Sequence, residues 1–209
     1  MDKITSLYST SVALIGSIVC ESINHYGTEA QKQNYLSALA RGEYIGAFAL
    51  TEPHAGSDPV MQHTTAERDG DVYILNGNKR FITSGRHSGL VIVTAKTAPA
   101  ERHKGISAFL VEKKFPGISV GREEDKMGLR ASDTTDLIFE NCQVPVENRL
   151  GREGEGFKIA MAALDGGPTS SAGVPMTHTL PATFFASMTL ARAMAAPMPV
   201  GPCMLCWQP

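Results

Sequence analysis

Four short runs of strand-favouring residues follow one another in the middle of the sequence, and their spacing limits the fold more than any other feature. The runs occupy residues 72–75 (VYIL), 90–93 (LVIV), 107–111 (SAFLV) and 136–139 (DLIF). Glycine-containing pairs separate them: Asp69-Gly70, Asn76-Gly77, Lys104-Gly105 and Pro116-Gly117. Short runs divided by such turn residues predict an antiparallel sheet or barrel. No G-x-G-x-x-G follows a strand and opens a helix, which argues against a Rossmann dinucleotide-binding fold.

Two helices are predicted before this region. The first is indicated by apolar residues that recur at steps of three and four: Val12, Ile15, Val19 and Ile23. It is expected to end near residues 25–27, and its apolar face is interpreted as part of a core. Thr28 and Gln31 then form a capping box, in which each side chain accepts a hydrogen bond from the other residue's free backbone amide. The second helix is expected to stop at Gly42.

A third helix is predicted after the strand-rich region, beginning near Gly156. Three of its side chains are expected to face inward: Phe157, Met161 and Leu164. Beyond Gly167 the sequence is rich in proline and Arg192 is its only charged residue, so we expect an irregular tail in which only residues 182–196 could form a helix. The predicted fold class is therefore α+β, with short N-terminal helices, an antiparallel β middle domain, a helix start and an irregular Pro-rich tail.

Charge and composition exclude several classes of function. Lys and Arg number 19 against 21 Asp and Glu, a formal net charge of −2, which offers no electrostatic basis for binding nucleic acid. The apolar run at residues 12–20 is too short to span a membrane, and no cleavage site follows it, so neither a membrane segment nor a secretion signal is predicted. Cys203 and Cys206 form a C-x-x-C without a second pair, and no metal site is predicted.

The stretch at residues 49–58 (ALTEPHAGSD) carries the most suggestive chemistry. Pro53 stiffens its entry, while Gly56 between small neighbours lets the backbone come close to a ligand. Thr51 and Ser57 supply hydroxyl groups. Such a turn could seat a pyrophosphate or a flavin. The alternative is an ordinary surface loop, because Gly-Ser-Asp turns are common connections.

Several motifs in order give the sequence a family resemblance. Residues 49–58 and 76–85 (NGNKRFITSG) resemble the signature of the flavin-dependent acyl-CoA dehydrogenases, and three further segments agree: 27–36 (GTEAQKQNYL), 125–130 (DKMGLR) and 139–145 (FENCQVP). The resemblance covers roughly residues 8–167 and is closest to the short-chain, butyryl-CoA type. It implies a fragment with four parts. These are a partial N-terminal helical domain (1–43), a middle β domain for flavin and acyl-CoA (44–150), the start of the C-terminal helical domain (151–167) and a non-matching tail (168–209).

The same resemblance implies that FAD is the cofactor and names the residues that would hold it. The cofactor-binding residues would be Phe48, Ala49, Leu50, Thr51, Gly56, Ser57, Phe81, Ile82 and Thr83. Residues 48–57 would line the flavin and residues 81–83 would form its second wall. Ser57 and Asp165 would contact the acyl-CoA substrate.

The expected reaction is the α,β-dehydrogenation of a short- or medium-chain acyl-CoA, in which a glutamate removes the α proton. Gly167 stands where one branch of the family has this glutamate, and the other branch carries it in the C-terminal domain. No catalytic residue is therefore assigned, and we expect a truncated chain that is inactive alone. Expected partners are acyl-CoA, an electron-transfer flavoprotein and further copies of the chain, in bacterial cytoplasm or the mitochondrial matrix.

Two alternatives remain at this point. The first is a non-catalytic remnant that binds flavin, CoA or a partner subunit without turnover. The second is a related flavoenzyme such as a nitroalkane oxidase, whose base is an aspartate in the helical domain. Both alternatives keep the predicted fold and differ only in chemistry.

Overall fold

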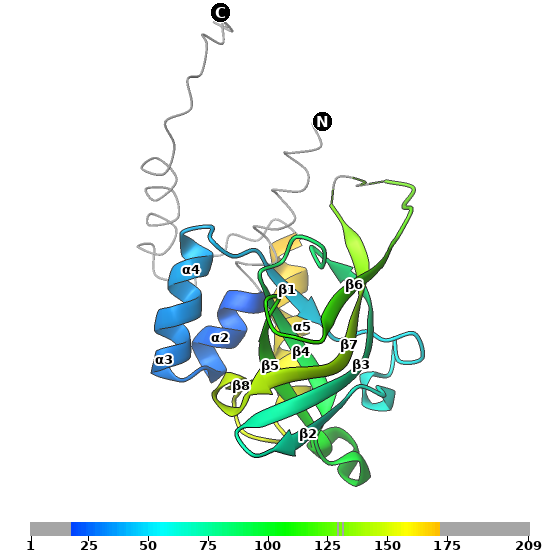
Figure 1. The fold of residues 1–209 in the computed structure, drawn as a ribbon. Coiled ribbons are helices and arrows are strands. Elements are labelled where there is room, and N and C mark those ends of the chain that lie inside the picture. The colour runs from blue at the N-terminus through cyan, green and yellow to red at the C-terminus, as the bar shows by residue number, and fades with distance from the viewer. Residues whose placement is uncertain (1–17, 129, 131, 172–209) are drawn as a thin grey trace, which may run out of the picture.

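A computed structural model describes residues 18–128, 130 and 132–171 of the chain, and a sheet of eight strands forms its centre (Figure 1). The strands are β1 (Gly46–Ala49), β2 (Thr65–Asp69), β3 (Val72–Thr83), β4 (Leu90–Lys96), β5 (Ile106–Glu112), β6 (Ile118–Glu123), β7 (Thr134–Pro145) and β8 (Arg149–Leu150). The helical segments are α2 (Cys20–Tyr26), α3 (Glu29–Gln31), η2 (Lys32–Leu36), α4 (Ser37–Ala40), η3 (Pro59–Met61), η4 (Pro99–Gly105), η5 (Val146–Asn148) and α5 (Gly156–Ser171). The α+β prediction is confirmed.

The sheet is mostly antiparallel, in the order β6-β7-β3-β2-β4-β5-β8, with β1 beside β4. Two pairings are parallel, β1 with β4 and β2 with β4, and the sequence pattern did not predict them. Parallel neighbours require a long crossover instead of a tight turn. Here the β2–β3 hairpin lies between β1 and β4 in the chain, so β1 and β4 can run side by side in the same direction.

One predicted turn is wrong, at Asn76-Gly77. These residues lie inside the long strand β3, at an irregularity in its pairing with β7. The side chain of Asn76 accepts a hydrogen bond from the backbone amide of Asn141 at 2.8 Å. Gly77 has φ +153°, and a Cβ there would come within 2.4 Å of the Thr64 hydroxyl. This Asn-Gly pair therefore forms a β-bulge that admits a close neighbour, whereas Asp69-Gly70 makes the predicted hairpin turn.

The N-terminal helices dock on the sheet through a buried glutamine. The capping box is confirmed, since the Gln31 amide donates to the Thr28 hydroxyl at 3.2 Å and the Gln31 side chain accepts from the Thr28 amide at 3.0 Å. The Nε2 of Gln31 also donates to the carbonyls of Glu147 and Arg149, at 2.6 and 3.0 Å. One residue thus both starts the helix and fastens it beside β8. Val19 and Ile23 are buried as predicted, while Val12 and Ile15 lie outside the described residues.

Two apolar clusters lie on either side of the sheet. On one side, β2, β3, β4, β5 and β7 enclose a cluster that includes Tyr73 and Phe109, whose rings meet edge to face with centroids 4.9 Å apart. On the other side, α2, η2, α4 and α5 cover β4 and β5, and Figure 1 shows these helices gathered there. The strands β4 and β5 are therefore apolar on both faces, which explains their nearly unbroken apolar sequences.

The helix α5 exists as predicted, but its inward face is wrong. Its buried side contains small residues as well as one large one: Gly156, Ile159, Ala160 and Ala163. Leu164, predicted to face inward, is 47% exposed, and Phe157 and Met161 are half-buried. A Cβ on Gly156 would lie 2.4 Å from the carbonyl carbon of Ser107, so the helix approaches β5 too closely for larger side chains. The helix extends to Ser171, past the predicted tail start, and the predicted helix at 182–196 lies outside the described residues.

Candidate functional site

The structure brings together the two segments that were predicted to bind flavin. Residues 48–57 run from β1 into the following loop, and residues 81–83 end β3. The backbone amide of Arg80 donates a hydrogen bond to the carbonyl of Thr51 at 2.8 Å, which joins the two segments directly. The end of β3 pairs with the start of β7, since Thr83 lies opposite Thr134. The two predicted walls are therefore neighbours in the fold.

The loop after β1 contains a closed turn followed by an open backbone. Glu52 and Ala55 exchange two backbone hydrogen bonds of 3.0 and 3.1 Å, which close the turn. The next residue, Gly56, is exposed, and a Cβ built on it would meet nothing within 4 Å. Ser57 is also exposed. The space into which a Cβ of residue 56 would point is therefore open.

Phe81 presents an aromatic ring in a strained backbone conformation. Its φ is +58°, in the left-handed region that costs a non-glycine residue roughly 1–2 kcal/mol. The cause is the irregular register between β3 and β7 from Lys79 to Ile82. The side chain is 53% exposed, and the Arg80 guanidinium carbon lies 5.0 Å from the ring centroid. Strain at a half-exposed aromatic residue is a common mark of a functional position.

The other predicted cofactor residues differ in how they could reach a ligand. Ala49 and Ile82 are buried in the core, so only their backbone atoms could contact a ligand. The side chains of four more are half-buried: Phe48, Leu50, Thr51 and Thr83. Within the described part of the chain, the hydroxyls of Thr51, Ser57 and Thr83 have no protein hydrogen-bond partner. Asp165 is exposed on α5, and no described contact links it to these segments.

A buried ion pair supports the loop, and sequence reasoning missed it. The Nζ of Lys79, which is fully buried, donates to the Glu52 carboxylate at 2.8 Å, the Leu50 carbonyl at 3.0 Å and Gln62 Oε1 at 2.9 Å. Thr94 Oγ1 lies 3.3 Å away. The available signal was a lysine at an inward position of a strand, which requires an acidic partner inside the protein.

The surroundings of this pair favour its charged form at neutral pH. Burial lowers the pKa of Lys79 to about 8, and the attraction of Glu52 opposes that shift. Burial alone would raise the pKa of Glu52, but the charge of Lys79 and the hydrogen bonds from His63 and Thr64 outweigh it and lower that pKa. Both pKa values are lowered, but the effects on charge are opposite: the shift of Lys79 disfavours its charged form, whereas the shift of Glu52 favours its charged form. The charged pair prevails because every neighbour of Lys79 Nζ is an oxygen that can accept.

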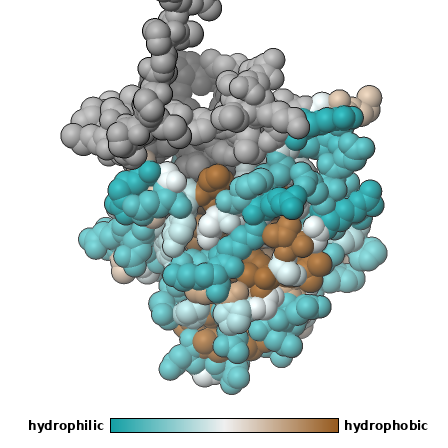
Figure 2. All heavy atoms as spheres, turned by 45° about the horizontal axis from the view of Figure 1, so that its top comes forward, coloured by the Kyte–Doolittle hydropathy of each residue, from teal (hydrophilic) through white to brown (hydrophobic). Residues whose placement is uncertain are grey.

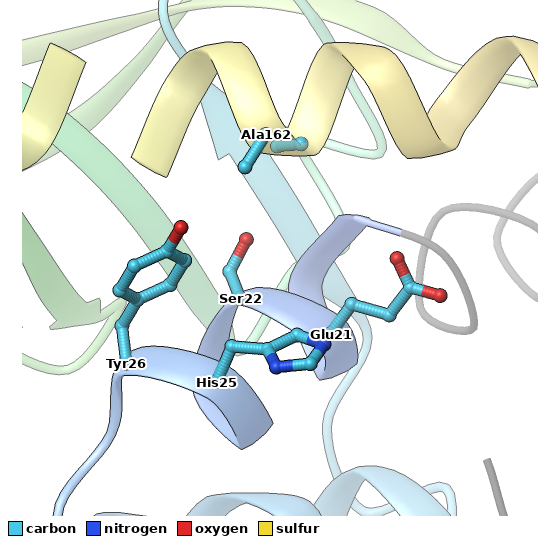
Figure 3. A pocket seen from close by; sticks show the side chains of 6 residues that line it. Glu21, Ser22, His25, Tyr26 and Ala162 are labelled. Atoms are coloured by element: carbon cyan, nitrogen blue, oxygen red, sulfur yellow. The ribbon is translucent and has the colours of Figure 1, made fainter. Parts of the chain in front are cut away.

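A separate pocket lies between α2 and α5, away from these segments. Glu21, Ser22, His25, Tyr26, Ala162 and Ala163 line it, and Figure 3 shows Ser22 and Tyr26 pointing from α2 towards α5. In the view of Figure 2, apolar side chains gather near the middle of the visible face, among hydrophilic ones. Among the described residues, no helix is long and apolar enough to cross a membrane, and no three metal-ligating side chains cluster.

Comparison with known families matches two consecutive domains. The acyl-CoA dehydrogenase N-terminal domain matches residues 1–43, and the acyl-CoA dehydrogenase middle domain matches residues 47–142. The short-chain specific acyl-CoA dehydrogenase of Clostridium acetobutylicum is 53% identical over 151 residues, which is 72% of this chain and 40% of that protein. The chain thus spans about 40% of the length of this curated relative.

Solved structures give the same result. Butyryl-CoA dehydrogenase from Megasphaera elsdenii is 43% identical with a TM-score of 0.75, covering 87% of this chain and 46% of that one. A structure described as the electron transferring flavoprotein of Acidaminococcus fermentans is 54% identical with a TM-score of 0.72, covering 73% and 40%. An acyl-CoA dehydrogenase from Bacillus anthracis, complexed with FAD, is 44% identical with a TM-score of 0.65, covering 69% and 24%.

Proposed function

This chain belongs to the acyl-CoA dehydrogenase family, and on that premise we propose that it binds FAD on the face formed by residues 48–57 and 81–83. The reaction that this face serves is the α,β-dehydrogenation of a short- or medium-chain acyl-CoA. The proposal assigns Ser57 and Asp165 to the acyl-CoA. The domain bounds expected from the sequence are part of the same proposal.

The observation that carries the proposal is that the segment with the open backbone at Gly56 is joined, through Thr51 and Arg80, to the end of β3 that bears the exposed ring of Phe81. A flat aromatic cofactor needs an unobstructed approach, an apolar surface and a few donors at its polar edge. Gly56 supplies the approach and Phe81 the aromatic surface. Thr51 and Thr83 add hydroxyls that no protein group occupies within the described residues. The residues present therefore fit a flavin.

The division of work follows from these side chains. A bound FAD would supply the hydride acceptor for the β carbon of the substrate. The chain's own residues hold the cofactor: Phe81 packs against it, and the Thr51 and Thr83 hydroxyls and the Gly56 backbone fix its orientation. A substrate held beside it gains rate from orientation, for which correct positioning is worth up to about 7–11 kcal/mol.

No described residue is assigned as the catalytic base. Glu52 lies within the segment 48–57, and both its oxygens accept hydrogen bonds, from Lys79, His63 and Thr64. Position 167, where one branch of the family has its glutamate, is glycine. A positioned base contributes about 10²–10⁴ in rate. We therefore propose that this chain alone binds flavin without turning over acyl-CoA.

An electron-transferring flavoprotein is the proposed electron acceptor, and further copies of the chain are proposed as partners. The first proposal follows from the family, and a similar chain occurs in a structure described by that name. The proposed compartment is the bacterial cytoplasm or the mitochondrial matrix, since similar proteins come from bacteria and from mitochondria.

The flavin site can be tested at Gly56 with a matched control at Gly128. A Cβ at either glycine meets nothing within 4 Å, so Gly56→Val and Gly128→Val should both change stability by less than about 0.5 kcal/mol. Gly56→Val should weaken FAD binding by at least about tenfold, since the valine fills the approach. Fluorescence titration of the full chain with FAD measures this. Equal affinities for the two variants would overturn the assignment of the site.

The alternative of a flavoenzyme with its own base is tested by reduction. Butyryl-CoA added under anaerobic conditions to the FAD-loaded chain should leave the flavin absorption unchanged. Bleaching of the flavin would show that the chain carries a base and would contradict the non-catalytic part of the proposal.

A further inference from the structure

We propose that Lys79 is a positioning residue for flavin binding: with Glu52, it holds the loop of residues 52–64 in the shape that leaves Gly56 open. This inference rests on the proposed function, because it takes that loop to be flavin-binding. Lys79 itself is fully buried and touches no ligand surface. Its effect must therefore pass through the residues that it holds.

Glu52 ties both ends of the loop together. Its backbone closes the turn to Ala55, just before Gly56. Its carboxylate accepts hydrogen bonds from the amide of His63 and, at 3.0 Å, from the amide of Thr64, where the loop returns to β2. The position of this one carboxylate thus sets where the loop leaves the sheet and where it comes back.

Lys79 connects this carboxylate to both flavin-binding segments. It bonds to the carbonyl of Leu50, the residue before Thr51, at 3.0 Å. The next residue along β3, Arg80, donates its amide to the Thr51 carbonyl, and Phe81 follows. Two adjacent residues of β3 therefore hold Leu50 and Thr51, the two residues that lead into the loop. The spacing between the loop and the aromatic wall is fixed at this point.

The returning end of the loop, near β2, is held by the same ammonium group. Gln62 is fully buried, and its Oε1 accepts from Lys79 and from the Thr94 hydroxyl at 2.9 Å. Its Nε2 has no partner among the described residues. Because an ammonium only donates hydrogen bonds, it forces the oxygen of Gln62 inward and leaves the nitrogen unpaired. The Gln62 side chain is thus oriented by Lys79 at the cost of one hydrogen bond.

Removing Lys79 leaves the Glu52 carboxylate buried without a counter-charge. Such a charge is strongly unfavourable, and it is relieved either by protonation of Glu52 or by opening of the loop to water; either change removes the ion pair that holds the loop. An opened loop must be closed again before it can bind a ligand, so part of the binding energy is lost to reordering. This loss separates a positioning role from general stability, because a destabilised protein with an intact loop retains its ligand affinity.

The test compares Lys79→Met with Asn148→Leu in the full chain. Asn148 is buried and donates to Leu110 and Tyr35, both at 2.8 Å, but it lies outside the loop, so its loss is a matched structural control. FAD dissociation constants are measured at the same margin below each variant's unfolding midpoint. Lys79→Met should weaken binding by about tenfold more than Asn148→Leu. Equal weakening in the two variants overturns the proposal.

A double variant covers the case in which Lys79→Met does not fold. Lys79→Met combined with Glu52→Gln leaves no buried charge at this pair, so the double variant should fold, yet it lacks the ion pair that holds the loop. It should also bind FAD about tenfold more weakly than Asn148→Leu, and an affinity equal to that control overturns the inference.

Hydrogen exchange distinguishes failure of this inference from failure of the proposed function. A wild-type chain that binds no FAD overturns the proposed function alone. The amides of His63 and Thr64, which donate to Glu52, still report whether the loop is held, and they should exchange at least about tenfold faster in Lys79→Met than in Asn148→Leu. Unchanged exchange at these two amides overturns the role of Lys79 whether or not flavin binds.

Discussion

Backbone strain at Phe81 gives a prediction with an unusual sign. Its φ of +58° is unfavourable for any side chain with a Cβ, by roughly 1–2 kcal/mol, and costs glycine nothing comparable. At an ordinary strand position glycine is less stable than alanine by about 0.5–1 kcal/mol. At position 81 the relief of strain should exceed that loss. We expect Phe81→Gly to be more stable than Phe81→Ala by about 0.5–1 kcal/mol.

The comparison of two variants removes the contribution of the ring, because neither has one. The matched control is Val120, a half-exposed residue of β6 without a positive φ. There, Val120→Gly should be less stable than Val120→Ala by about 0.5–1 kcal/mol. Urea unfolding of the four full-length variants, with equal m-values, measures both differences. If the glycine variant is less stable than the alanine variant at both positions, the proposed backbone strain at Phe81 is refuted.

The same variants connect strain to ligand binding. Both Phe81→Ala and Phe81→Gly lose the aromatic surface, so both should bind FAD more weakly by about 1 kcal/mol, or roughly fivefold. Phe81→Trp should retain the affinity. Equal FAD affinity in wild type and the three Phe81 variants would show that the ring does not face the cofactor.

Three further predictions concern pH, helix docking and the N-terminal helices. The pKa of Glu52 is lowered in the folded protein, so its contribution to stability is complete above the ordinary value of 4.5 and is lost as the pH falls through the native pKa. The difference in unfolding free energy between wild type and Glu52→Gln should therefore decrease between about pH 6 and about pH 3, as measured by urea titrations. Gly156→Ala should destabilise the chain by about 1–3 kcal/mol, because its Cβ would clash with the Ser107 backbone, and an unchanged thermal midpoint would contradict this close approach. Gln31→Met should cost about 1–3 kcal/mol by urea unfolding, since two partly buried carbonyls lose their donor; a loss below about 0.5 kcal/mol would show that the helices dock without it.

Local sequence signals predicted the elements that depend on neighbouring residues. The hairpin turn at Asp69-Gly70 and the capping box of Thr28 and Gln31 are set within a few residues, and both are confirmed. Asn76-Gly77 has the composition of a turn but forms a bulge, because Asn141, far along the chain, holds Asn76. Local composition cannot reveal a partner that only the fold brings near.

The candidate site shows the same limit. Resemblance pointed to residues 48–57 and 81–83, and the structure brings these two segments together. It did not point to Lys79, since a lysine within a strand pattern is usually solvent-exposed and only Glu52 across the fold makes its burial tolerable. The inward face of α5 was missed for a related reason: small residues at Gly156 and Ala160 allow close packing, which a search for large apolar residues overlooks.

The central claim is that residues 48–57 and 81–83 form one flavin-binding face, and the most direct measurement is retention of FAD by the purified full chain. The chain is mixed with FAD, desalted and examined by visible absorption, in parallel with Gly56→Val and Gly128→Val. The account predicts flavin absorption in the protein fraction of wild type and Gly128→Val, and its loss in Gly56→Val. A colourless wild-type fraction, or flavin retained equally by all three proteins, would contradict it.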